Sequence, residues 1–138
     1  MIDQRHFELK NRTQQFAIRI LHLADALPSA RSANAIANQV VRSGSSVASN
    51  YWAAGRSRSR ADFVSKISVV VEEADETVFW LELLAKSGIV KPQRLNPLLK
   101  EANELVAIFA ASRRTAKSHR SKNARGDDGD RGDDGDSI

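Results

Sequence analysis

The sequence predicts an all-α protein, an antiparallel up-and-down four-helix bundle over residues 1–112 with a disordered, charged C-terminal tail over residues 113–138. Three observations support this fold class. A chain of 138 residues with 41% hydrophobic and 28% charged residues can build one core in one domain. Aromatic residues make up only 6%, fewer than β-sandwiches usually need. Apolar residues recur at steps of three and four in four segments joined by short links.

The first predicted helix covers about residues 3–27, and Pro28 ends it because the residue before a proline avoids the α conformation. Its apolar face carries Phe16, Ile20, Leu23 and Leu27. The second covers about residues 32–54. Its apolar face carries Ile36, Val40, Val47 and Tyr51. Small residues fill positions 43–49, which favours close packing against another helix. A phosphate-cradling loop is the alternative, but Gly44 stands alone and no Lys-Ser or Lys-Thr pair follows it.

The third predicted helix begins with a capping box, in which Ser59 is the N-cap and Asp62 replaces the usual Glu. Gly88 occupies the position of a C′ glycine. Its core face alternates steps of four and three through Phe63, Ile67, Val70, Ala74, Thr77, Leu81 and Leu84. The fourth helix runs from near Pro92 to about Ser112 or beyond, with a regular start expected at Asn96 because of Pro97. Its face carries Leu95, Leu98, Ala102, Leu105 and Phe109.

Composition excludes several kinds of site. The chain has no Cys, so disulfides, thiolate metal sites and cysteine nucleophiles are ruled out. None of the three His residues has a Glu three positions before it, as di-metal bundles require. No apolar run reaches the ~20 residues that span a bilayer, and the first residues lack a signal-peptide pattern. We therefore expect a cytoplasmic protein without membrane association, metal, cofactor or catalytic activity.

The positive charge is concentrated near the C-terminus. The formal net charge is +4, but residues 1–125 hold twenty basic and eleven acidic residues. Six of these positive charges fall within residues 111–125: Arg113, Arg114, Lys117, Arg120, Lys122 and Arg125. Residues 126–138 contain six Asp and one Arg in a short repeat. The basic stretch is either a solvated surface or a phosphate-binding arm. The acidic tip either keeps the chain soluble or competes with nucleic acid for that arm.

A second basic cluster, Arg56, Arg58 and Arg60, lies between the second and third predicted helices. Such a cluster in a loop is typical of phosphate contacts, and Tyr51 and Trp52 are close enough in sequence to stack on bases. The alternative is a solvated loop with Tyr51 buried.

The third helix also carries paired carboxylates. Glu72 and Glu76 are four residues apart and share a face, which favours salt bridges within the chain or between subunits. Arg42 on the second helix is the candidate partner. Trp80 is expected either beside the core or at an oligomer interface.

Four stretches closely resemble the bacterial four helix bundle protein family: residues 42–51 (RSGSSVASNY), 54–63 (AGRSRSRADF), 66–77 (KISVVVEEADET) and 80–84 (WLELL). That family includes proteins encoded in intervening sequences of large-subunit ribosomal RNA genes, and it is related to the accessory protein of diversity-generating retroelements. Many relatives have Arg-Glu-Ala after the Asn-Tyr pair, where this chain has Trp52-Ala53-Ala54.

The resemblance covers about residues 7–112 and implies a small cytosolic bundle that forms a ring-shaped homo-oligomer, a pentamer, without catalysis. Its retroelement relatives use a basic surface to engage nucleic acid and a reverse transcriptase. We therefore predict an oligomeric bundle that binds RNA or DNA through its basic loops and tail. The alternative is a scaffold that binds a protein partner and has no nucleic-acid role.

Overall fold

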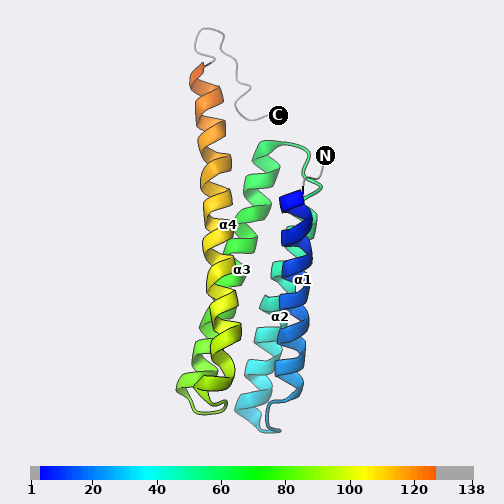
Figure 1. The fold of residues 1–138 in the computed structure, drawn as a ribbon, viewed down its shortest axis with the longest axis vertical. Coiled ribbons are helices and arrows are strands. Elements are labelled where there is room, and N and C mark those ends of the chain that lie inside the picture. The colour runs from blue at the N-terminus through cyan, green and yellow to red at the C-terminus, as the bar shows by residue number, and fades with distance from the viewer. Residues whose placement is uncertain (1–3, 127–138) are drawn as a thin grey trace.

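Four consecutive α-helices form the described part of the molecule (Figure 1). The structure is a computed structural model that describes residues 4–126, with side chains for residues 4–119. The elements are α1 (Gln4–Asp25), α2 (Arg31–Ala54), α3 (Arg60–Lys86) and α4 (Pro92–Gly126). Within residues 4–126 there is no strand, so the predicted all-α class is confirmed. No described helix is long and apolar enough to cross a lipid bilayer.

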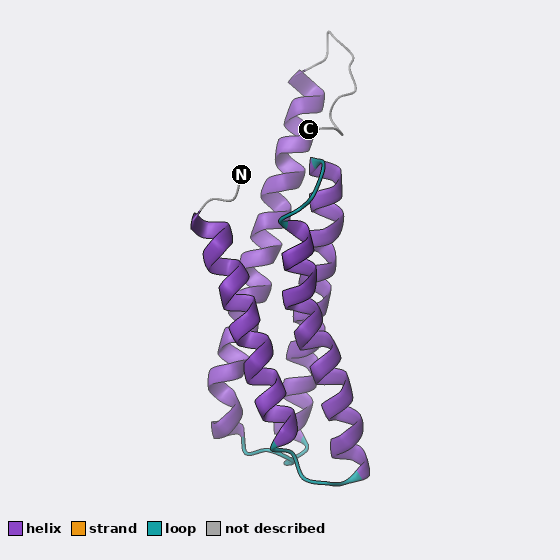
Figure 2. Cartoon of the chain, turned by 90° about the vertical axis from the view of Figure 1, so that its right-hand side faces the viewer, coloured by secondary structure: helices purple, strands orange, loops and turns teal. Residues whose placement is uncertain are grey.

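The helices pack in chain order, with α2 against α1, α3 against α2, and α4 against α3. Direct contact between α1 and α4 is sparse by comparison. The loops at 26–30 and 87–91 lie together at one end of the bundle, and the loop at 55–59 lies at the other (Figure 2). The first turns of α1 and the second half of α4 are at the same end as residues 55–59 (Figure 1). This topology decides which charged side chains become neighbours.

The predicted apolar faces form a single core. Each large side chain in this core adds roughly 1.5–3 kcal/mol by leaving water. The largest fully buried apolar side chains are Phe16, Ile20, Val40, Val47, Ile67, Val70, Leu81, Leu84, Leu95, Leu105 and Phe109. Phe63, Leu23 and Leu27 of the predicted faces are partly buried and pack against this core.

The small-residue stretch of α2 packs closely against two neighbouring helices, as predicted. Gly44 is buried under Ile20 of α1, so closely that a Cβ on Gly44 would lie 2.9 Å from the Ile20 Cγ1 atom. On the α3 side, the buried hydroxyls of Ser43 and Thr77 lie 2.9 Å apart. The Thr77 hydroxyl also donates to the Glu73 carbonyl oxygen at 2.8 Å. Residues 43–49 are helical throughout, so they do not form a phosphate-cradling loop.

The predicted N-cap and C′ glycine of α3 are confirmed, but the capping box is only half formed, because the Asp62 carboxylate accepts the backbone N–H of Arg58 instead of that of Ser59. The Ser59 side chain accepts the backbone N–H of Asp62 at 3.0 Å, as an N-cap does. At the other end Ser87 is the C-cap and Gly88 has a φ of +81°. Glycine adopts this left-handed conformation without the steric cost that a Cβ would add.

The structure differs from the sequence-based boundary at residue 112. α4 begins at Pro92, includes Pro97 and continues to Gly126, so residues 113–126 are helical and not a separate disordered tail. Ala116 is buried and extends the apolar stripe of Leu105 and Phe109, so α4 packs on the bundle as far as this residue, and the end of the helix projects beyond the other three helices (Figure 1). Pro97 is the sixth residue of α4 and has no N–H to donate to the Gln93 carbonyl oxygen, so the helix continues through it with one backbone hydrogen bond fewer. The acidic repeat over 127–138 lies outside the described residues.

Candidate nucleic-acid interface

The net positive charge of the described side chains lies at one end of the bundle. Residues 4–10, 51–66 and 111–119 meet there, and they contain nine Lys or Arg and two Asp or Glu. Residues 11–50 and 67–110 hold eight basic and eight acidic residues. The first set, which we call the basic end, therefore carries a formal charge of +7, and the rest is neutral.

The loop between α2 and α3 is held by the Asp62 carboxylate. This carboxylate accepts the backbone N–H of Arg58 at 3.2 Å and the ammonium group of Lys66 at 3.0 Å. The two contacts lower the pKa of Asp62, through Lys66 first and the Arg58 N–H second. Asp62, one of the two acidic residues of the basic end, is thus already paired with a Lys.

The start of α1 packs on the last turn of α2. The His6 Nδ1 atom lies 2.9 Å from the Tyr51 hydroxyl, and the two rings are 4.9 Å apart. A Cβ on Gly55 would lie 2.3 Å from the His6 Nε2 atom, so a larger residue there would have to displace this ring. Tyr51 is buried against Phe109, so of the two alternatives for this residue the structure supports burial and not stacking on a base.

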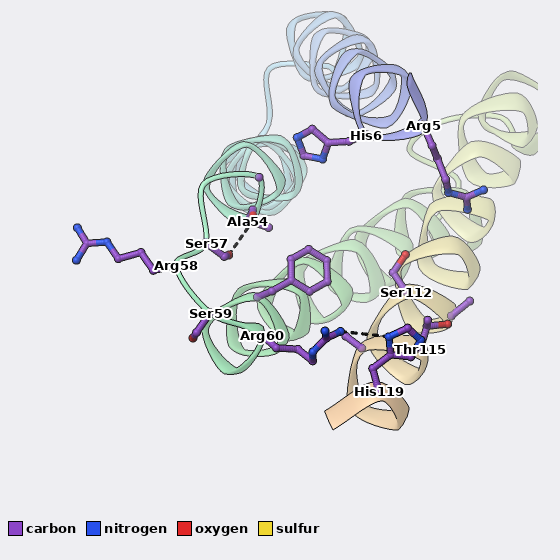
Figure 3. Close-up of a pocket in the computed structure, with 14 residues that line it drawn as sticks. Arg5, His6, Ala54, Ser57, Arg58, Ser59, Arg60, Ser112, Thr115 and His119 are labelled. Carbon is purple, nitrogen blue, oxygen red and sulfur yellow. Dashed lines mark hydrogen bonds between the residues drawn. The ribbon is translucent and has the colours of Figure 1, made fainter. Parts of the chain in front are cut away.

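A cleft of about 680 Å³ opens between the start of α1, the α2–α3 loop and α4 (Figure 3). No carboxylate lines it in the described part of the chain. Its polar lining comprises Arg5, His6, Ser57, Arg58, Ser59, Arg60, Ser112, Thr115 and His119. Phe63 and four small residues, Ala54, Gly55, Ala111 and Ala116, complete the wall. The cleft thus offers cations and hydroxyls beside an aromatic ring.

Arg60 and His119 meet across this cleft, from α3 and α4 (Figure 3). The Arg60 Nη1 atom lies 3.3 Å from the His119 Nδ1 atom. Because a guanidinium group can only donate, the His119 Nδ1 atom is the acceptor in this contact. The Arg60 Nε atom is buried and has no hydrogen-bond partner among the described residues. Arg60 therefore keeps a donor that no acidic side chain satisfies.

The other two loop arginines have different surroundings. Arg58 is exposed, and its side chain extends away from the cleft (Figure 3). Arg56 is exposed and lies 5.5 Å from the ring of Trp52, and the Lys10 ammonium group lies 3.7 Å from the same ring. Trp52 is 40% exposed, so it is an accessible aromatic surface beside two cationic side chains, Lys10 and Arg56.

The basic residues in the second half of α4 lie at the same end of the bundle. Arg114 and Lys117 are exposed and Arg113 is partly buried. Arg120 and Lys122 lie in the same helix, but their side chains are outside the described residues. The predicted loop and C-terminal clusters are thus brought together by the topology.

The predicted interhelix contacts occur within the chain. Arg42 of α2 pairs with Glu76 and Glu73 of α3, the latter at 3.1 Å. Hydrogen bonds from the Trp80 indole and then from Arg42 lower the pKa of Glu76. Glu73 takes the place predicted for Glu72, which is exposed, because Glu73 and Glu76 are one turn apart on the side facing α2.

Sequence reasoning missed two features of this arrangement. Arg12 of α1 bridges to α4, with hydrogen bonds of 2.7 and 2.8 Å to Glu101 and 2.7 Å to Glu104. The cleft residues Arg5 and His119 were also not singled out. The up-and-down topology was the available signal, since it brings residues 4–10 and 111–119 to the end that holds residues 55–59.

The fold and this end of the molecule define a small helical bundle with a segregated cationic surface. The model of the 23S rRNA-intervening sequence protein family matches residues 5–111. The chain therefore belongs to this family. The structure is similar to the crystal structure of a protein of unknown function from the S23 ribosomal protein family of Bacteroides thetaiotaomicron. The two share 29% identity with a TM-score of 0.70, over 74% of this chain and 94% of that chain. No protein in the curated collection matches significantly.

Proposed function

We propose that this chain is a non-enzymatic, homo-oligomeric bundle that binds nucleic acid through its basic end. The observation that carries the proposal is the charge distribution, in which the basic end holds +7 and the remainder is neutral. Clustered Lys and Arg bind the phosphate backbone by releasing its counterions. The family description refers to 23S rRNA, so RNA is the first nucleic acid to test.

Self-association would bring several copies of the basic end together in one assembly. Besides Phe7 at the start of α1, exposed large apolar side chains of the described residues occur in two separate places: Ile18, Leu21 and Trp52 on α1 and α2, and Phe79 and Leu83 on α3. Two different apolar patches suit a head-to-tail contact, which forms a ring when the rotation between subunits closes. A ring, which we expect to be pentameric, would place several basic ends on one nucleic acid and raise the affinity by avidity.

Salt dependence tests the nucleic-acid proposal. Fluorescence anisotropy with a labelled structured RNA and a matched DNA duplex is measured from about 50 to 200 mM salt. We expect a steep loss of affinity as the salt concentration rises. The triple variant Arg56→Gln, Arg58→Gln and Arg60→Gln should reduce the slope, as should Arg113→Gln, Arg114→Gln and Lys117→Gln together.

The matched control removes the same charge from the opposite end of the bundle. Arg31, Lys91 and Arg94 are exposed there, and changing all three to Gln should leave the salt slope unchanged. Equal losses from both ends would contradict a localised interface. A flat salt response of the unaltered protein would contradict nucleic-acid binding altogether.

A protein-binding scaffold is the second candidate function, and a groove between α1 and α2 favours it. This groove, of about 520 Å³, is mostly apolar. It is lined by Gln14, Ala17, Ile18, Ser45, Ala48, Ser49 and Trp52. Light scattering of Ile18→Glu distinguishes the two uses of the surface. Dissociation to monomers would assign the groove to self-association. An unchanged oligomer, with a nuclease-resistant protein partner that Ile18→Glu loses, would favour the scaffold.

A further inference from the structure

We propose that the cleft at the basic end binds one unpaired nucleotide of a single strand, with Arg60 on its phosphate and Phe63 against its base. This inference rests on the proposed nucleic-acid function and specifies the form of the ligand. It distinguishes a defined binding site, the cleft, from the general attraction of the positive charge around it.

The first support is that Arg60 has no acidic partner among the described residues, unlike Arg12 and Arg42, which also connect two helices. Arg12 has Glu101 and Glu104 as partners, and Arg42 has Glu73 and Glu76. Arg60 instead has an imidazole nitrogen at 3.3 Å and a buried Nε atom without a partner.

A buried cationic donor that lacks a partner is costly for the free protein. An anion that accepts from the free donor would remove that cost. A phosphate group has several acceptor oxygens and suits the planar guanidinium fork.

The second support is the composition of the cleft wall. Arg5 extends from the start of α1 toward α4, on the side of the cleft opposite Arg60 (Figure 3). The hydroxyls of Ser57, Ser59, Ser112 and Thr115 are further polar groups of the wall. No carboxylate of the described residues faces the cleft, so nothing there repels an anion.

The third support is the size of the cleft and its aromatic residue. Small-ligand sites have volumes of roughly 300–1,000 Å³, and the 680 Å³ of this cleft is in the range for one nucleotide. Phe63 is partly buried and contributes to the wall, where its ring can stack on a base. A base in a duplex is stacked between its neighbours and must leave the helix to reach such a wall. The cleft therefore favours unpaired nucleotides over duplex.

The test compares an unstructured single strand of about ten uridylates with a blunt GC-rich RNA duplex of equal length, at one salt concentration. We expect the single strand to bind at least about fivefold more tightly. Arg60→Gln should weaken single-strand binding about tenfold and abolish this preference, as the loss of a charge-assisted contact does. Arg56→Gln is the matched control, because it removes the same charge from an exposed arginine of the same loop that does not line the cleft. It should cost about twofold and keep the preference.

Phe63 supplies an independent readout. Phe63→Leu should reduce single-strand affinity about fivefold and leave duplex binding unchanged, whereas Phe63→Tyr, which keeps the ring, should retain the preference. Thermal unfolding of each variant verifies that the bundle is folded.

Equal binding of single strand and duplex would overturn this inference and leave the proposed function standing. Equal effects of Arg60→Gln and Arg56→Gln would also overturn it. Failure of both probes to bind would remove both proposals.

Discussion

At the scale of single residues, Gly44 controls how closely α1 approaches α2. A Cβ at this position would lie 2.9 Å from the Ile20 Cγ1 atom and 3.2 Å from its Cβ atom. Because the Ile20 Cβ atom is fixed to the backbone, rotation of the side chain cannot relieve the overlap, and the helices must separate. The packing seen here therefore depends on the absence of a side chain.

Gly44→Ala should lower the free energy of unfolding by up to about 2 kcal/mol. Overpacking costs typically 1–3 kcal/mol and outweighs the gain of about 1 kcal/mol in helix propensity. Urea unfolding measures the change. Asn38→Ala, an exposed substitution in the same helix, should stay within about 0.5 kcal/mol of the unaltered protein. A more stable Gly44→Ala variant would mean that α1 and α2 are not in close contact here.

Glu101 is the residue whose ionisation links α1 to α4. Its hydrogen bonds from Arg12 lower its pKa below the ordinary value of 4.5. The unfolded state therefore binds a proton more readily than the folded state. This part of the stability is complete above pH 4.5 and is lost as the pH falls through the lowered pKa of the folded state.

Glu101→Gln should cost about 1 kcal/mol at neutral pH, because the pair is only partly shielded from solvent. The difference from the unaltered protein should shrink toward zero in acid, since both then lack the carboxylate charge. Urea unfolding at pH steps from about 7 down to about 3 records this convergence. A difference that stays constant with pH would argue against the ion pair as its source.

At the scale of elements, the N-terminus of α3 ends the α2–α3 loop and also positions the arginines of that loop. The Ser59 hydroxyl satisfies the Asp62 N–H, and the Asp62 carboxylate satisfies the Arg58 N–H. These two bonds fix the backbone between Arg58 and Arg60, which contribute to the cleft wall. Capping in this protein thus has a consequence for the candidate site as well as for helix stability.

Ser59→Ala should destabilise the protein by about 1 kcal/mol through loss of the N-cap bond. Ser59→Thr retains an acceptor oxygen and should recover most of that loss. Thermal unfolding compares the three proteins. No loss in Ser59→Ala would indicate that water replaces the cap at little cost.

At the scale of the whole molecule, the positive charge of the described side chains is concentrated at one end of the bundle. Residues 127–138 lie outside the described structure and contain six Asp and one Arg, a formal −5. Their sequence follows directly on the basic helix. The hypothesis that this acidic repeat competes with nucleic acid is an electrostatic one and can be tested by deletion.

A chain that ends at Gly126 should bind RNA several-fold more tightly than the full chain at low salt. The two should converge as salt rises, because screening weakens an intramolecular competition between charges. Anisotropy titrations over about 50–200 mM salt measure both affinities. Identical affinities at low salt would assign the repeat to solubility and remove the competition.

Sequence alone determined the four helices, the buried face of each and the caps of α3. Those features follow from the 3.6-residue period and from local hydrogen bonds, which neighbouring residues specify. It also determined that Arg42 needs a carboxylate on the third helix. Only the tertiary structure decided that this carboxylate is Glu73 together with Glu76, and that Tyr51 is buried. It also placed Arg60 beside His119. Those outcomes depend on how far each helix is rotated and shifted against its neighbour, which side-chain packing across the whole core fixes.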